Sequence, residues 1–213
     1  MDPFHFYTKL DQPLLLGQQA KTIEELLAGV RSVPDSSIYY HTHRFLQQHQ
    51  FLSPEPPNDF AFWAGNVLGD DALGERLWSV DTIRFNNISE LRDRLIGILE
   101  IQLNSRGRTV ECHPGEEFHF MACRTFVLPT AYNAHDLREF SQLLPKVSIS
   151  SVYFHMFDAK LRLKTGENDF SRWFRALGHN ALANEMQRLD PYSFTLDGLR
   201  QRIIALVRQH ESH

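Results

Sequence analysis

Hydrophobic and polar residues change their spacing along the first thirty positions, and each change predicts an element. The aromatic residues at 4–7 favour a strand, and the polar turn at 11–13 followed by Leu14–Leu16 predicts a short hairpin. Residues 22–25 (Thr-Ile-Glu-Glu) have the spacing of a capping box, and apolar residues then return every three to four positions over 23–30. The chain therefore begins with a predicted hairpin and continues as a helix.

Helical spacing also dominates the next seventy residues, with polar or proline-rich breaks between the segments. A helix is expected after Asp35-Ser36 and has to end before the proline-rich loop at 53–57. Asn58 is the expected N-cap of a third helix, a shorter helix covers about 72–80, and a long one covers about 89–103. The first hundred residues therefore read as a two-stranded hairpin, the helix at 22–30 and these four helical segments, of which the one at about 72–80 is short.

The same order of residues occurs a second time. Phe4-His5-Phe6 recurs as Phe118-His119-Phe120, Ser36–His41 recurs as Ser150–His155, and Asn58-Asp59-Phe60 with Trp63 recurs as Asn168-Asp169-Phe170 with Trp173. The matches keep their order over about a hundred residues, which chance does not produce. We predict an internal duplication with a first repeat at 1–104, a second repeat at 105–213, and a boundary in the polar stretch 104–108.

Two copies are too few for a solenoid or a propeller, so a simpler arrangement is expected. We predict a mainly α (α+β) fold of two tandem modules, each a short β-hairpin followed by about four helices. The counterpart of the first hairpin is expected over 118–127, with a break at Pro129. The two modules are expected to pack about an approximate two-fold axis, as the subunits of a homodimer do.

Composition and charge narrow the class of protein. The 213 residues are 42% hydrophobic and 23% charged, which describes a soluble globular chain. No apolar run reaches the roughly 18 residues of a membrane span, no secretory signal is visible, and two cysteines are too few for a disulfide framework. We therefore expect a cytoplasmic protein without a membrane partner. A net charge of −4 disfavours nucleic acid as a partner.

The repeated residues form a signature of Tyr-x-His followed by Asn-Asp-Phe-x-x-Trp. In this order, with Leu-Gly and Ala-Leu after it, each copy resembles an uncharacterised prokaryotic family whose domain joins a short hairpin to a helical segment. The resemblance covers nearly the whole chain as two tandem copies. It implies the predicted fold but no activity and no cofactor, because none is established for that family.

The polar members of the signature are the candidate site residues: His41, Asp59 and Trp63 in the first repeat, and His155, Asp169 and Trp173 in the second. The favoured interpretation is structural, since a histidine on an apolar helix face usually bonds a backbone group or a nearby helix N-terminus. The alternative is a divalent metal site between the modules, for which imidazole and carboxylate are suitable ligands. The candidate metal ligands are His5, His41, His119 and His155.

A second group of candidates is basic. Lys160, Arg162, Arg172 and Arg175 gather in the second repeat where the first is neutral or apolar, which is typical of a solvated face or of an anion-binding groove. Cys112 and Cys123 have no counterparts in the first repeat and are interpreted as ordinary reduced cysteines.

No complete catalytic motif is present, so the sequence does not name a reaction. The leading hypothesis is a non-catalytic cytoplasmic helical module that acts through a protein partner as an adaptor or regulator. One alternative is a metal-binding enzyme or sensor with a His/Asp site at the module interface. The other is a protein that binds an anion or a sugar phosphate.

Overall fold

The computed structural model describes residues 2–48, 58–105, 110–163, 166–190 and 193–211. The predicted loop at 53–57 and most of the predicted boundary at 104–108 lie outside the described residues. The first half of the chain contains β1 (Phe4–Ala20), α1 (Ile23–Ser32), α2 (Asp35–Gln48), α3 (Asp59–Phe62), the π-helical turn η1 (Trp63–Val67), α4 (Asp71–Trp78), the 3-10 turn η2 (Thr82–Arg84) and α5 (Ile88–Ser105).

The second half repeats this order of a strand and helices, but its π-helical turn lies within the second helix instead of after the third. It contains β2 (Phe118–Ala134), α6 (Leu137–Leu143), α7 (Ile149–Tyr153), the π-helical turn η3 (Phe154–Asp158), α8 (Ala159–Leu163), α9 (Asp169–Ala176), α10 (Asn180–Gln187) and α11 (Leu196–Glu211). The helices predicted at 72–80 and 89–103 correspond to α4 and α5. Among the described residues, no helix has the length and apolar character needed to cross a bilayer.

The chain divides into two compact units that are discontinuous in sequence. Unit 1 comprises residues 1–10, 46–53 and 125–213, and unit 2 comprises residues 11–45 and 54–124. Each unit therefore contains helices that come mainly from one predicted repeat, together with a segment of both strands. The start of β1 belongs to the helices of the second repeat, and the start of β2 belongs to those of the first.

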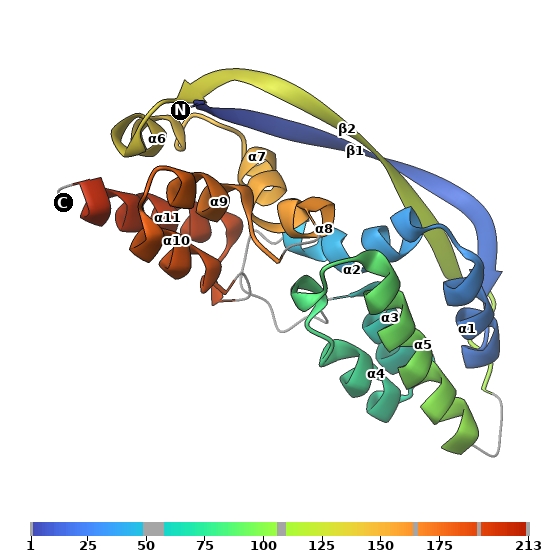
Figure 1. Ribbon diagram of the computed structural model, residues 1–213. Helices are drawn as coiled ribbons and strands as arrows, with labels where there is room; N and C mark the ends of the chain where they lie inside the picture. The colour runs from blue at the N-terminus through green and yellow to red at the C-terminus, as the bar shows by residue number, and fades with distance from the viewer. Residues whose placement is uncertain (1, 49–57, 106–109, 164–165, 191–192, 212–213) are drawn as a thin grey trace. The chain divides into compact units, whose positions relative to one another are not determined.

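The two strands pair with each other along their lengths, side by side in Figure 1. In unit 1, His5 Nδ1 lies 2.7 Å from Asn133 Oδ1, and in unit 2, Gln19 Nε2 lies 3.3 Å from His119 Nδ1. Because residue numbers rise along β1 while they fall along β2, the pairing is antiparallel. The described part of the chain is thus mixed α+β, with a single sheet of two strands.

The predicted hairpins and the pseudo-dimer built from two hairpin modules are wrong. Residues 4–20 form one strand of 17 residues, and residues 118–134 form another. Pro13 and Pro129 suggested turns, but proline is compatible with an edge strand because its missing N–H can fall on the open side. Both strands of a two-stranded sheet are edge strands. The turn signals therefore did not end the strands.

The predicted starts of α1 and α3 are confirmed, whereas α2 begins at Asp35 itself and not after Asp35-Ser36. Thr22 Oγ1 accepts a hydrogen bond from the Glu25 N–H, as in a capping box, whereas Glu25 Oε2 accepts one from the Lys21 N–H, one residue before the cap. Asn58 caps α3 by accepting from the Ala61 N–H at 2.8 Å. These local contacts involve residues three to four apart, so the sequence pattern is sufficient to predict them.

The second repeat has the same caps. Asp136 Oδ1 accepts from the Glu139 N–H, and Glu139 accepts in return from the His135 N–H. That backbone hydrogen bond, with a further one from the His135 ring, lowers the pKa of Glu139. Asn168 Oδ1 accepts from the Ser171 N–H at the start of α9, as Asn58 does in α3.

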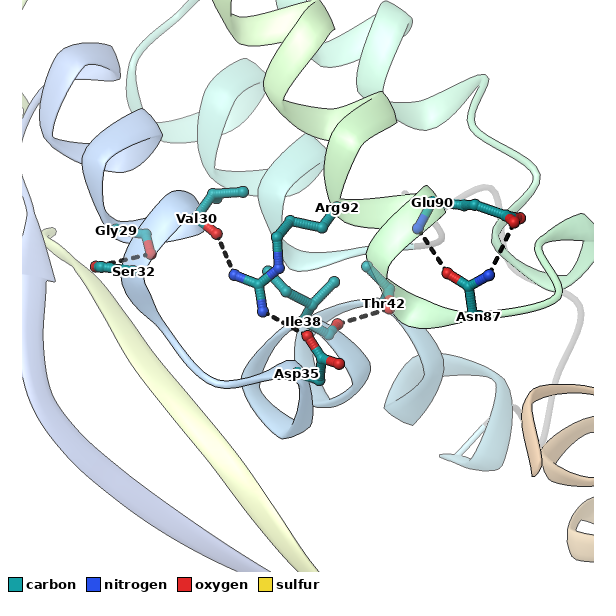
Figure 2. A network of polar contacts seen from close by, with 9 residues as sticks. All are labelled: Gly29, Val30, Ser32, Asp35, Ile38, Thr42, Asn87, Glu90 and Arg92. Atoms are coloured by element: carbon teal, nitrogen blue, oxygen red, sulfur yellow. Dashed lines mark hydrogen bonds and ion pairs between the residues drawn. The ribbon is translucent and has the colours of Figure 1, made fainter. Parts of the chain in front are cut away.

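A repeated arginine ties the last helix of each unit to the connection between its first two helices. In unit 2, the Arg92 guanidinium donates to the Val30 carbonyl and pairs with Asp35 Oδ1 at 2.8 Å, as Figure 2 shows. In unit 1, Arg200 donates to the Val147 carbonyl at 3.1 Å. Val30 lies in the last turn of α1, where the helix itself leaves carbonyls open, and Val147 lies in the segment between α6 and α7.

Gly29 in α1 tests how closely the start of β2 packs in unit 2. A Cβ at this position would lie 2.1 Å from Phe120 Cζ, and the Phe120 side chain is fully buried. We expect Gly29→Ala to lower the free energy of unfolding by about 1–3 kcal/mol, because the ring has to be displaced within a close-packed core.

Gly97→Ala is the matched control for that prediction. Gly97 is also inside a helix of unit 2, but a Cβ there meets no atom within 4 Å. It should leave stability unchanged or raise it by up to about 1 kcal/mol, through the better helix propensity of alanine. Urea unfolding curves of both variants make the comparison. Equal effects at the two positions would show that the ring does not pack on α1.

Candidate functional site

His155 connects a strand to a helix N-terminus inside unit 1. Its Nε2 accepts a hydrogen bond from the Tyr7 N–H of β1 at 2.9 Å, and its Nδ1 lies 2.7 Å from Asp169 Oδ2. Since a nitrogen that accepts from an amide carries no proton, the proton of the neutral ring is on Nδ1 and is donated to the carboxylate. The side chain of His155 is 3% exposed. Both ring nitrogens are therefore used inside the fold.

His41 makes the same two contacts inside unit 2. Its Nε2 accepts from the Met121 N–H of β2 at 2.9 Å, and its Nδ1 lies 2.8 Å from Asp59 Oδ2. The imidazole is buried, with 3% of its side chain exposed, and the proton again belongs on Nδ1. In each unit, a helical histidine thus holds one backbone amide of a strand, and an aspartate in the next helix orients the histidine.

Two phenylalanines of each strand fill an aromatic pocket beside that histidine. In unit 1, the Phe4 ring lies 5.3 Å from Phe170 and 5.5 Å from Trp173 between ring centroids, and Phe6 lies 5.4 Å from Phe140. Phe4 and Phe6 are 6% and 1% exposed. These separations are those of favourable aromatic pairs, so the pocket contributes a large apolar area to the docking of the strand.

Unit 2 has the equivalent pocket. Phe118 stacks on Phe60 at 5.2 Å and meets Trp63 edge-on at 5.8 Å, while Phe120 meets Phe118 at 5.0 Å. The His41 ring lies 4.7 Å from Phe118. The histidine is therefore part of the pocket wall as well as the hydrogen-bond acceptor.

The tryptophan of each signature contacts the backbone just before the strand begins. Trp63 Nε1 donates to the Glu116 carbonyl at 2.8 Å, and Trp173 Nε1 lies 3.4 Å from the Asp2 carbonyl. Each of these carbonyls lies two residues before the first phenylalanine. The residue whose N–H donates to the histidine lies three positions after that phenylalanine.

We call each such set of four residues a strand clamp. The unit 1 clamp is His155, Asp169, Phe170 and Trp173, and the unit 2 clamp is His41, Asp59, Phe60 and Trp63. Each clamp binds an extended segment through one carbonyl, two phenylalanine rings and one amide. In both units the segment and its clamp come from different predicted repeats. The repeated spacing of the signature is explained residue by residue by this contact.

The unit 1 clamp has additional contacts with its strand. Ser151 Oγ donates to the Tyr7 carbonyl at 2.6 Å, and Lys9 Nζ lies 2.6 Å from Asp158 Oδ2, with the ammonium 4.8 Å from the centroid of the Tyr153 ring. Only 2% of the Lys9 side chain is exposed. The sequence gives no signal for this buried ion pair, because the two charges are far apart in the chain and resemble ordinary surface residues.

The histidines do not gather into a metal site in the described part of the chain. No group of three or more His, Cys, Asp or Glu residues is arranged there to hold a metal ion. His5 and His119 are exposed and bond Asn133 and Gln19 across the sheet. His41 and His155 lie in different units, each with its own aspartate, so the structure provides two His–Asp pairs.

The four basic candidates do not form a described anion groove either. Arg172 is exposed, whereas Arg175 pairs with Glu167 at 3.1 Å and donates to Asn184 at 3.3 Å. Lys160 is half-buried in α8, and the side chain of Arg162 lies outside the described residues. The charge of Arg175 is thus balanced inside unit 1.

Both cysteines are half-buried and reduced. Burial, together with the nearby Glu117 carboxylate, raises the pKa of the Cys112 thiol, which keeps it protonated at neutral pH. The Cys123 thiol lies 3.8 Å from the Ser36 carbonyl. Neither of these contacts supplies the positive charge that activates a thiolate nucleophile.

Comparison with known proteins gives a family. A model of a family of unknown function, DUF5752, matches residues 1–208. The chain belongs to this family. The model matches once across both predicted repeats, so the match itself shows one family domain and not two tandem copies. No function is attached to the family, which leaves the strand clamps as the chemistry to be interpreted.

A solved structure has the same fold. The DUF5752 chain described here superposes on OrfY from Thermoproteus tenax with a TM-score of 0.84 at 26% sequence identity, covering 99% of this chain and 96% of that one. Among curated proteins no match was found.

The two aspartates of the clamps differ in exposure, which predicts a difference in their energetic contribution. The Asp169 side chain is 15% exposed and the Asp59 side chain 56% exposed. Asp169→Ala should lower the free energy of unfolding by about 2–3 kcal/mol, because the His155 N–H is left buried without its acceptor. Asp59→Ala should cost about 1 kcal/mol or less, since water can replace the carboxylate.

Thermal and urea unfolding of the two alanine variants measure this difference. Each variant has the same substitution at the same place in the clamp, so each serves as the control for the other. A larger loss for Asp59→Ala than for Asp169→Ala would contradict the assignment.

Proposed function

We propose that this protein is a non-catalytic cytoplasmic interaction module that binds a protein partner, as an adaptor or regulator, through the open parts of its two strands. The observation that carries the proposal is a set of exposed apolar residues. In unit 2, Leu14–Leu16 are exposed in a row, with Leu15 at 64%. In unit 1, Leu10 is 60% exposed, and Phe126–Leu128 are each exposed by more than two fifths.

The run of consecutive exposed residues matters because side chains alternate between the two faces of a strand. Leu14, Leu15 and Leu16 therefore expose apolar surface on both faces of β1. Phe126, Val127 and Leu128 do the same on β2. Two strands without a covering layer bury too little apolar surface to be stable by themselves, and contiguous exposed apolar surface marks interaction sites.

The charge pattern supports an apolar partner surface. No Asp, Glu, Lys or Arg occurs between Asp11 and Lys21 in β1, or between Arg124 and Asp136 in β2. A nucleic acid or an anionic ligand requires cations, which these stretches lack. An apolar face of another protein meets them without burying a charge.

The strand clamps support a non-catalytic role. Both nitrogens of His41 and of His155 are engaged by the protein itself, so these rings are not open to a substrate or a metal ion.

We also propose that the family domain arose by duplication of a half-sized module with repeats at 1–104 and 105–213. The identical contacts of the two clamps support that origin.

Leu15→Glu tests the proposed contact surface. The substitution places a charge at the most exposed leucine of β1, and surface substitutions of this kind change stability by about 0.5 kcal/mol or less. We expect at least one protein that wild type retains from an extract of its native cells to be reduced at least tenfold. Quantitative mass spectrometry of the retained proteins measures this.

Ile101→Glu is the matched control, because Ile101 in α5 is 59% exposed but belongs to neither strand. It should retain the partner as wild type does. If no retained protein depends on Leu15, or if both variants lose the same proteins equally, the proposed surface is wrong.

A further inference from the structure

We infer that each strand clamp is a binding site for an extended Phe-x-Phe segment as such, and that it accepts this segment from a second copy of the chain as well as from its own. This site is separate from the apolar strand surface proposed above. The partner that each clamp would bind is another molecule of this protein.

The recognition elements of the clamp are few and close together. The tryptophan donates a hydrogen bond to one backbone carbonyl of the segment, and the histidine accepts one from a backbone N–H. Between these two contacts, the aromatic pocket holds the two phenylalanine rings. The residue between the two phenylalanines, His5 or His119, is exposed and contacts the neighbouring strand instead. The clamp therefore recognises Phe-x-Phe in an extended backbone, and the identity of the residue x is not recognised. Binding through backbone atoms plus alternate side-chain pockets is a common mode of peptide recognition.

The two Phe-x-Phe segments of the chain, at 4–6 and 118–120, have the same features that the clamps recognise. Both have the sequence Phe-His-Phe, and both are held at the same two backbone positions. The clamps also contain the same four residue types. A clamp that binds one of the segments thus has the groups required to bind the other.

Each segment reaches its clamp from a distant part of the chain. Tyr7 and His155 are separated by 148 positions, and Met121 and His41 by 80. The local backbone does not impose pairings over such separations, and the entropy of closing loops of this size changes little with their length. A second copy offers an identical segment, and exchange of identical elements between protomers is a low-cost route to a dimer because it makes the same contacts.

A peptide experiment on the full chain tests the site. The variant Phe4→Ser/Phe6→Ser removes both rings from the segment that fills the unit 1 clamp. A fluorescein-labelled peptide with the sequence of residues 2–9, Asp-Pro-Phe-His-Phe-Tyr-Thr-Lys, is titrated with this variant, and anisotropy is measured. We expect the variant to bind at least tenfold more tightly than wild type, whose clamp is filled.

The matched control is the same peptide with serine in place of both phenylalanines, which should bind at least tenfold more weakly. Trp173→Ala added to the variant should weaken binding of the original peptide as well. If the folded variant binds neither peptide, or binds both equally, the clamp is not a Phe-x-Phe site.

A second measurement tests the partner with substitutions that leave every ring in place. Thr8 Oγ1 and Ser148 Oγ are 2.8 Å apart at the unit 1 clamp, which brings the two side chains close enough for a disulfide. Full chains carrying only Thr8→Cys and only Ser148→Cys are mixed and oxidised. Because each carries one half of the pair, a crosslink at this site requires the strand of one copy in the clamp of another.

We expect a disulfide-linked dimer between the two variants at least fivefold above the level that each variant forms alone, with peptide mapping placing the bridge between positions 8 and 148. The single-variant samples also measure the background from Cys112 and Cys123. No dimer above that background overturns exchange between copies. Peptide binding without the dimer shows that the clamp recognises the segment but takes it from its own chain, and the second copy as partner is then wrong.

Discussion

The hydrogen bond from a strand amide to a helical imidazole is the contact on which each unit depends. It joins an element with no core of its own to the helices that have one. The amide of Tyr7 or Met121 would otherwise face an aromatic pocket, where an unsatisfied N–H is costly. The aspartate selects the ring tautomer that can accept, so three polar groups are satisfied together within an apolar environment.

This constraint explains why the signature residues occur where they do. Asn58 starts the helix, Asp59 faces the histidine from its first turn, and Phe60 and Trp63 contact the strand from the same end of the helix. The same assignments apply to Asn168, Asp169, Phe170 and Trp173. The His, Asp and Trp residues of the signature, which in the sequence resemble a set of metal ligands, thus hold extended backbone in the structure.

The arrangement also separates two kinds of strand surface. The ends of β1 and β2 are held by clamps and bury their phenylalanines, whereas the stretches containing Leu10, Leu14–Leu16 and Phe126–Leu128 expose apolar side chains. Clamped ends hold the strands in the extended form that presents these stretches. The proposed function in protein interaction rests on this division, because the polar chemistry is used internally and the apolar surface is left outside.

The sequence by itself determined most of the helices and their caps, because caps and helical spacing involve contacts only three to four residues apart. It did not determine the strand pairing. A proline such as Pro13 or Pro129 is compatible both with the turn of a short hairpin and with a long edge strand. Only the pairing of β1 with β2 across the sheet decides between these two structures. It also left open whether His41 and His155 bind metal. The strand amides that they accept come from residues 80 and 148 positions away, so only the tertiary structure could assign both ring nitrogens.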